Sequence, residues 1–234
     1  MFDLFGKKIT LSVFLLIALY GLTQPVGTNL PNYDKEWLHF GITLNSNVSS
    51  YKIYRDLSLN TDDSIMTVNS TRNPGFGVGI ISNIAFLDYF DLRFIPTLSF
   101  ATRRISYQMV TALPASKATE FINVEFPMHL KVKSARMDNF RFYMLGGGKY
   151  SYNMVSNSNA TDEKARYLVI TNPGFWALEY GAGTDFYFEM FKFSLEVKLT
   201  DGMGSILKDG QTLRYATVID KLIPKTILFS LHFE

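Results

Sequence analysis

The sequence predicts an all-β fold, an eight-stranded antiparallel up-and-down transmembrane β-barrel with a polar plugged lumen. Three observations predict it. Long segments alternate apolar and polar residues with a period of two. The connections between them are alternately short and long, as in outer-membrane barrels. An apolar stretch near the N-terminus has the form of a secretory signal peptide.

Composition narrows the possible classes. The chain has 234 residues and a net charge of +2; 47% of its residues are hydrophobic and 19% are charged. One domain is the first expectation at this length. The absence of Cys excludes a disulfide framework, a thiolate zinc site and a Cys nucleophile. The low charge without a basic run argues against nucleic acid as a partner. A soluble all-β domain and a membrane β-barrel remain.

The N-terminus favours the membrane barrel. Lys7 and Lys8 precede an apolar run over residues 9–22, which is shorter than the roughly 20 residues that a spanning helix needs. We interpret residues 1–22 as a signal peptide, 23–37 as an N-terminal periplasmic segment and 38–234 as the barrel. An uncleaved anchor is the alternative to cleavage. The expected location is the outer membrane of a Gram-negative bacterium, after signal-peptide cleavage.

The strands are predicted from the alternation. In residues 191–200, Phe193, Leu195 and Val197 alternate with Ser194 and Glu196. Each expected strand has room for the roughly 9–11 residues that a tilted membrane strand needs. The eight expected strands cover residues 38–47, 75–86, 90–105, 119–133, 140–153, 174–188, 191–201 and 225–233. Short turns are expected at 87–89, 135–139 and 189–190, and long loops at 48–74, 154–173 and 202–224.

Phenylalanines gather near the predicted periplasmic rim, where an interfacial aromatic girdle is expected. For each residue alone, core packing in a soluble sandwich is the competing explanation. The predicted girdle consists of Phe40, Phe86, Phe90, Phe94, Phe140, Phe142, Phe186, Phe188, Phe191 and Phe233.

The polar positions of the same strands predict the lumen. An eight-stranded barrel is just wide enough for side chains to fill, and buried charges are costly unless they are paired. We therefore expect a network of ion pairs and hydrogen bonds, and not a channel lining; the alternative is the solvated face of a soluble sheet. The predicted lumenal residues are Arg93, Glu125, His129, Lys131, Arg141, Glu179, Asp185, Lys192, Glu196 and Lys198.

The sequence predicts no catalytic residue, no cofactor and no metal. If the first and last strands close the barrel, His39 and His232 become candidate neighbours facing inward at the periplasmic rim. Two imidazoles are possible metal ligands, but polar rim residues without a ligand are far more common. No histidine is expected near the outer rim, where a membrane esterase would need one beside a Ser. The protein is therefore not expected to be an enzyme.

Several blocks of sequence resemble one family. They are NLPNYDKEWLHFGITL (29–44), NPGFGVGIISNIAFLDYFDLRFIPTLSFATR (73–103), EFPMHLKVKSARMDNFRFYMLGGGKYSYN (125–153) and YGAGTDFYFEMFKFSLEVKLTDGM (180–203). Together they resemble the PorT family, called SprT in gliding relatives, which are outer-membrane β-barrels of Bacteroidetes. The resemblance implies a component of the type IX secretion system, which exports proteins with a C-terminal signal and supports gliding motility in some members. It implies no catalytic residue.

A lumen too narrow for folded cargo makes an accessory role the leading hypothesis, with outer-membrane lipid and other type IX secretion proteins as partners. No nucleic acid or small-molecule substrate is predicted. Residues 48–72 are the preferred extracellular contact, against a passive loop as the alternative. Two other classes stay open: a small general porin, and a soluble ligand-binding barrel whose apolar faces point inward.

Overall fold

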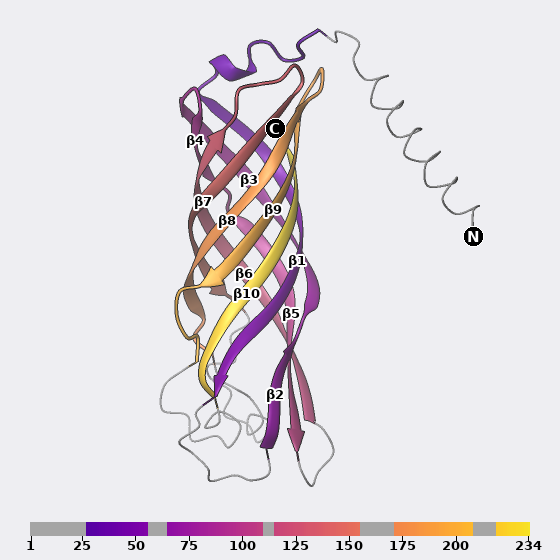
Figure 1. Ribbon diagram of the computed structural model, residues 1–234, viewed down its shortest axis with the longest axis vertical. Helices are drawn as coiled ribbons and strands as arrows, with labels where there is room; N and C mark the ends of the chain where they lie inside the picture. Colours follow the sequence, from indigo (N-terminus) through magenta and orange to yellow (C-terminus); the bar gives the residue numbers. More distant parts are fainter. Residues whose placement is uncertain (1–26, 56–64, 110–114, 155–170, 208–218) are drawn as a thin grey trace, which may run out of the picture.

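The computed structural model describes residues 27–55, 65–109, 115–154, 171–207 and 219–234, which form a long antiparallel β-barrel (Figure 1). A single 3-10 helix, η1 (Tyr33–Lys35), precedes the strands. No helix in these residues is long and apolar enough to cross a membrane. The strands are β1 (Leu38–Arg55), β2 (Ile65–Thr71), β3 (Asn73–Leu87), β4 (Phe90–Phe94), β5 (Thr97–Met109), β6 (Ala115–Lys133), β7 (Phe140–Asn153), β8 (Gly174–Tyr187), β9 (Lys192–Gly202) and β10 (Ile219–Phe233).

The sheet closes because β1 pairs with both β10 and β3. From β10 the pairing continues through β9, β8, β7 and β6 to β4 and β5, which pair with β3. β4 and β5 are successive halves of one barrel strand, which is interrupted at Ile95 and Pro96 because proline has no N–H for the ladder. We call each complete strand of the ring, whether it is one assigned strand or two, a stave. β2 likewise leads into β3 across Arg72. The ring therefore has eight staves, which confirms the predicted fold class.

Period-two alternation assigns the two faces of every stave. In β9, Ser194 and Glu196 are buried inside the barrel, whereas Leu195 and Val197 are exposed on its outer surface. β1 follows the same rule, with Thr43 buried and Leu44 exposed. The apolar side chains thus face outward and the polar ones inward, the reverse of a soluble barrel. A spanning sheet needs this arrangement and full closure, because lipid cannot hydrogen-bond an exposed backbone.

Both chain termini of the barrel lie at one end, together with the three short connections (Figure 1). These connections follow β3, β6 and β8, at the positions predicted for short turns. The opposite end carries the long connections. Outer-membrane barrels place short turns on the periplasmic side; we therefore name the end with the termini the periplasmic end and the other the extracellular end.

The predicted long loop at 48–74 is wrong in extent. β1 continues to Arg55, and β2 already begins at Ile65. Residues Lys52 and Tyr54 continue the ladder with β10, opposite Ile223 and Lys221. In this extension polar Ser50 and Lys52 take outward positions that apolar residues hold elsewhere on β1, so it lacks the alternation that marks a strand in the membrane. β10 likewise begins at Ile219, six residues before its predicted start at 225, which shortens the expected 202–224 loop. The predicted signal peptide, residues 1–22, lies outside the described residues.

Candidate functional site

The candidate site is the interior of the barrel together with the segment that crosses its periplasmic mouth. The structure places all ten predicted lumenal side chains inside the barrel, and each of these residues is at most 8% exposed. They come from every stave between β4 and β9, because each of these strands turns its polar positions inward.

Arg93 on β4 lies at the centre of the network. Its Nη1 is 3.3 Å from Glu196 Oε2, and its Nη2 is 2.9 Å from Glu234 Oε1. Its Nε donates a third hydrogen bond to Asn83 Oδ1 over 3.1 Å. One planar guanidinium thus joins β3, β9 and the end of β10 across the lumen.

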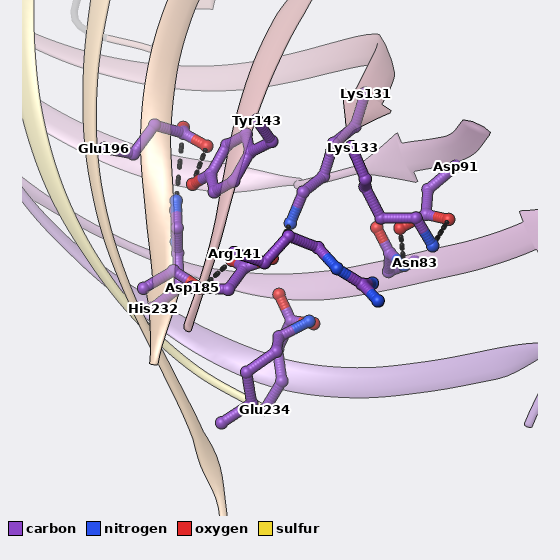
Figure 2. Close-up of polar contacts among 12 residues, drawn as sticks. Asn83, Asp91, Lys131, Lys133, Arg141, Tyr143, Asp185, Glu196, His232 and Glu234 are labelled. Atoms are coloured by element: carbon purple, nitrogen blue, oxygen red, sulfur yellow. Dashed lines mark hydrogen bonds and ion pairs between the residues drawn. The ribbon is translucent and has the colours of Figure 1, made fainter. Parts of the chain in front are cut away.

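Glu196 on β9 gathers several further partners (Figure 2). The Tyr143 hydroxyl donates to its Oε2 over 2.8 Å. Lys198 Nζ lies 3.0 Å and His232 Nε2 lies 3.1 Å from its Oε1. Oε2 thus accepts hydrogen bonds from Tyr143 and Arg93, whereas Oε1 makes no hydrogen bond within the described residues and has only the nearby Lys198 and His232 nitrogens as partners. The nearby cations offset part of the cost of burying this charge.

Two more pairs occupy the periplasmic half of the lumen. Lys131 Nζ is 2.7 Å from Asp185 Oδ2, and Lys133 Nζ is 2.6 Å from Asp91 Oδ1. Asn83 also donates to Asp91, over 3.0 Å, as Figure 2 shows. These contacts tie β6 to β8 and to β4.

A second cluster lies further along the same strands, toward the extracellular end. Lys149 Nζ is 3.0 Å from Glu125 Oε2 and 2.8 Å from Glu179 Oε1. Glu179 also accepts a hydrogen bond from the Thr200 hydroxyl over 2.7 Å, and its Oε2 is 2.8 Å from His129 Nε2. The cluster links β6, β7, β8 and β9.

A plug segment, residues 27–37, covers the periplasmic mouth. The Tyr33 ring stacks on His39 at 3.9 Å between centroids and meets Tyr187 edge-on at 5.8 Å. The Tyr33 hydroxyl donates to Glu234 Oε2 over 3.0 Å. Burial, together with the Glu234 carboxylate, raises the pKa of the Tyr33 phenol far above its ordinary value. Tyr33 therefore stays protonated and keeps donating.

Charged contacts hold the plug segment in place. Arg141 donates to both carboxylate oxygens of Asp34, each over 3.0 Å. Arg136 donates to the backbone carbonyls of Asn29 and Leu30. The bidentate arginine–carboxylate geometry is among the strongest that side chains form. The 23–37 segment, expected to lie in the periplasm, is thus ordered against the rim over its described part.

The charged side chains inside the barrel and at its mouth are paired within the described residues. Every basic side chain there contacts at least one carboxylate. The basic residues are Arg93, Lys131, Lys133, Arg136, Arg141, Lys149, Lys192 and Lys198; the acidic ones are Asp34, Asp91, Glu125, Glu179, Asp185, Glu196 and Glu234. These pairs stabilise the interior as a polar core. Removing one partner would leave the other charge buried and unpaired, which is costly in a medium of low dielectric constant.

Side chains pack closely at two places in the described part of the interior. A cavity of only about 10 Å³ lies beside Tyr33, Asp91 and Lys192 at the mouth, which is close to the smallest volume that holds one water molecule. Deeper inside, a Cβ atom at Gly183 would lie 2.4 Å from the Tyr143 ring. Glycine is required at this position because the tyrosine already fills the lumen there.

Sequence reasoning missed several members of the network. Lys149, Asp91 and Lys133 occupy inward positions of their strands, and Glu234 directly follows the last residue of β10, so continuing the alternation over every residue would have added them to the predicted set. Asp34 precedes the first strand and has no such signal. It reaches the lumen only because the plug segment folds back over the mouth.

The histidine pair does not form. His232 pairs with Thr43 in the β1–β10 ladder, four residues along β1 from His39. His39 Nε2 instead lies 2.9 Å from the Tyr33 carbonyl oxygen. No group of three or more potential metal ligands occurs in the described part of the chain.

The predicted girdle residues lie on the outer surface of the barrel. Phe40, Phe86 and Phe142 are more than half exposed, and Phe186 and Phe233 are partly covered by neighbouring rings. Phe193, which was not in the predicted girdle, joins these two: its ring centroid is 6.5 Å from that of Phe186 and 5.2 Å from that of Phe233. The rings form a continuous band over β8, β9 and β10, as expected at a membrane interface.

No protein-family model matches the chain, and no curated protein sequence matches it. Among solved structures, the outer membrane protein OprG from Pseudomonas aeruginosa is similar, with a TM-score of 0.51, 14% identity, and coverage of 88% of this chain and 95% of that one. Neisserial surface protein A matches with a TM-score of 0.42, 9% identity, and coverage of 84% and 98%. Ail of Yersinia pestis matches with a TM-score of 0.37, 14% identity, and coverage of 85% and 98%.

The likeness to OprG concerns the fold. Together with the outward apolar face and the closed ring, it defines the class of this protein: a small β-barrel with the fold of outer-membrane proteins.

Proposed function

We propose that this protein is an accessory component of the type IX secretion system in the outer membrane of a Gram-negative bacterium, where it acts after signal-peptide cleavage and without catalysis. Two things support the proposal. The four sequence blocks resemble the PorT family, and they cover both the plug segment and most of the barrel strands. The sealed interior agrees with a role that depends on surfaces and not on passage through the lumen.

The main observation in support of an accessory role is that contacts of Glu234 close the periplasmic mouth of the barrel. This carboxylate contacts Arg93, Lys192 and the hydroxyl of Tyr33, so that strands β4 and β9 and the plug segment meet at one point. A folded cargo protein has no route through such an interior. The remaining ways to support export are to stabilise or contact a larger translocon through the loops, the periplasmic rim or the lipid-facing surface.

The two other functional classes fit the arrangement less well. A porin needs a water-filled lumen, which the paired charges and the packing around Tyr143 oppose. A soluble ligand-binding barrel needs an apolar interior, whereas Arg93, Lys131 and Glu196 occupy it. Within the predicted contact loop, residues 48–72, the described parts other than Arg72 belong to β1 and β2 and offer strands as a contact surface; residues 56–64 lie outside the described residues.

Gene deletion tests the proposal. In a host with a type IX system, we expect cargo proteins with the C-terminal signal to accumulate in the periplasm, and gliding to be lost if the host glides. Re-expression of the wild-type chain restores export. An unrelated outer-membrane protein, blotted in parallel, should keep its normal level, which separates a secretion defect from general envelope damage. Normal export of signal-bearing cargo in the deletion strain would reject the assignment.

A further inference from the structure

The lipid-facing surface ends in a basic cluster at the extracellular end. Along the outer face of β10, Phe229 and Leu231 are exposed apolar residues, and Lys225 and Lys221 follow beyond them. On β1, exposed Leu44 is followed in the same way by exposed Lys52. We name Lys52, Arg72, Lys221 and Lys225, together with Asp201, the outer-rim cluster.

Strand register brings the cluster together. Lys225 pairs with Ser50 of β1 on one side and with Asp201 of β9 on the other. Lys221 pairs with Tyr54, two residues beyond Lys52 on the same face of β1. Arg72 is exposed and immediately precedes Asn73, which pairs with Ser49. Four cationic side chains thus project outward from neighbouring strands near the extracellular end, with Lys225 level with Ser50 and Lys221 four residues farther along β10.

Most of this positive charge is not neutralised by a carboxylate. Asp201 contacts Lys225 over 2.7 Å and accepts a hydrogen bond from the Tyr180 hydroxyl over 3.0 Å. Within the described residues, no ion pair joins Lys52, Arg72 or Lys221 to a carboxylate. Lys52 instead lies over the Tyr54 ring, 4.7 Å from its centroid. The neighbouring Asp220 belongs to the opposite face of β10 by alternation.

A groove of about 180 Å³ lies beside the cluster, and three cluster members, Arg72, Lys225 and Asp201, line it. Tyr180 adds a further polar group to its wall, and Val48, Leu199 and Ile227 supply its apolar surface. These three apolar residues continue into the outward apolar face of the barrel. The groove therefore suits a ligand that is anionic at one end and hydrocarbon at the other.

We propose that the outer-rim cluster binds the phosphorylated headgroup of a lipid in the outer leaflet of the membrane. Arg72 suits a phosphate because a guanidinium can donate two parallel hydrogen bonds, and the lysines add point charges. Acyl chains would lie along Val48, Leu199 and Ile227. A free phosphate shares the headgroup chemistry but makes no use of this apolar surface, so the lipid is the assigned source. Asp201 also lines the groove, where it holds Lys225 and Tyr180 and its negative charge opposes an anionic ligand.

Native mass spectrometry of the full purified barrel, titrated with bis-phosphorylated lipid A, tests the assignment. The test variant is Lys52→Gln/Arg72→Gln/Lys221→Gln, and the matched control is Lys35→Gln, an exposed lysine at the periplasmic end. We expect the dissociation constant to rise about tenfold or more in the triple variant and to stay unchanged in the control. Equal affinity of the wild type and the triple variant would overturn the proposal.

Three further binding measurements test the role of charge and the identity of the ligand. Asp201→Asn removes the only carboxylate in the cluster, and it should tighten lipid A binding several-fold; unchanged or weaker binding contradicts the electrostatic basis. Dephosphorylated lipid A should bind the wild type and the triple variant equally. Inorganic phosphate alone should bind far more weakly than lipid A, and equal affinity for the two would overturn the lipid as the ligand. Heat-shifted migration of each variant on gels verifies that it is folded.

Discussion

The basic residues inside the barrel and those on its outer rim are the same residue types in opposite circumstances. Arg93 is fully buried and holds two carboxylates, whereas Arg72 is exposed and, among the described residues, contacts none. Interior charges are fixed by their partners and so serve to fill and hold the barrel. On the rim, Lys225 pairs with Asp201, whereas Lys52, Arg72 and Lys221 have no carboxylate partner among the described residues and are available to bind a ligand outside the protein. Position relative to the membrane, and not residue type, decides the role of each charge.

Substitution of Arg93 tests the difference between interior and rim charges with the largest expected effect on stability. Arg93→Ala leaves Glu196 and Glu234 buried without their central partner, so we expect a loss of about 3–5 kcal/mol in the free energy of unfolding. Urea titration in lipid vesicles, followed by the fluorescence of Trp37 and Trp176, measures it. Lys35→Ala serves as the control. A loss below about 1 kcal/mol for Arg93→Ala would mean that the interior charges are as dispensable as surface ones.

Gly183 tests whether the interior is filled. Gly183→Ala places a methyl group 2.4 Å from the Tyr143 ring, and overpacking of this kind costs about 1–3 kcal/mol. Gly148→Ala is the matched control, since nothing lies within 4 Å of a Cβ there. The same unfolding titration compares the two. Equal stability of both variants would indicate a lumen with spare room.

Asp34 tests the plug segment separately from the barrel. Asp34→Asn weakens the contact with Arg141, and because the Asp34 side chain is partly exposed we expect only about 0.5–1 kcal/mol. Amide hydrogen exchange should accelerate over residues 29–36 while the barrel strands keep their protection. Unchanged exchange in that segment would show that the Asp34–Arg141 pair does not hold it in place.

The outer rim should show the smallest effect on stability. Lys52→Gln/Arg72→Gln alters exposed residues without ion-pair partners among the described residues, so unfolding should change by less than about 0.5 kcal/mol. The same titration measures it. A loss comparable to that of Arg93→Ala would abolish the distinction between interior and rim charges.

Alternation predicted the barrel and the inward direction of Arg93, Glu196 and Lys131, because lipid on one side and a narrow lumen on the other enforce period two along each stave. It could not predict the extension of β1 to Arg55, since outside the membrane no apolar face is required. Nor could it predict Asp34, whose position depends on a segment folding back over the mouth. Pairs such as Lys131 with Asp185 depend on register and tilt, which a single sequence does not specify.

The central claim is that paired charges and packed side chains seal this barrel. The conductance of the wild-type protein, purified from the outer membrane and inserted into planar lipid bilayers, tests it most directly. The account predicts insertion without a sustained current. A steady open-channel current, present in the wild type and proportional to salt concentration, would contradict it.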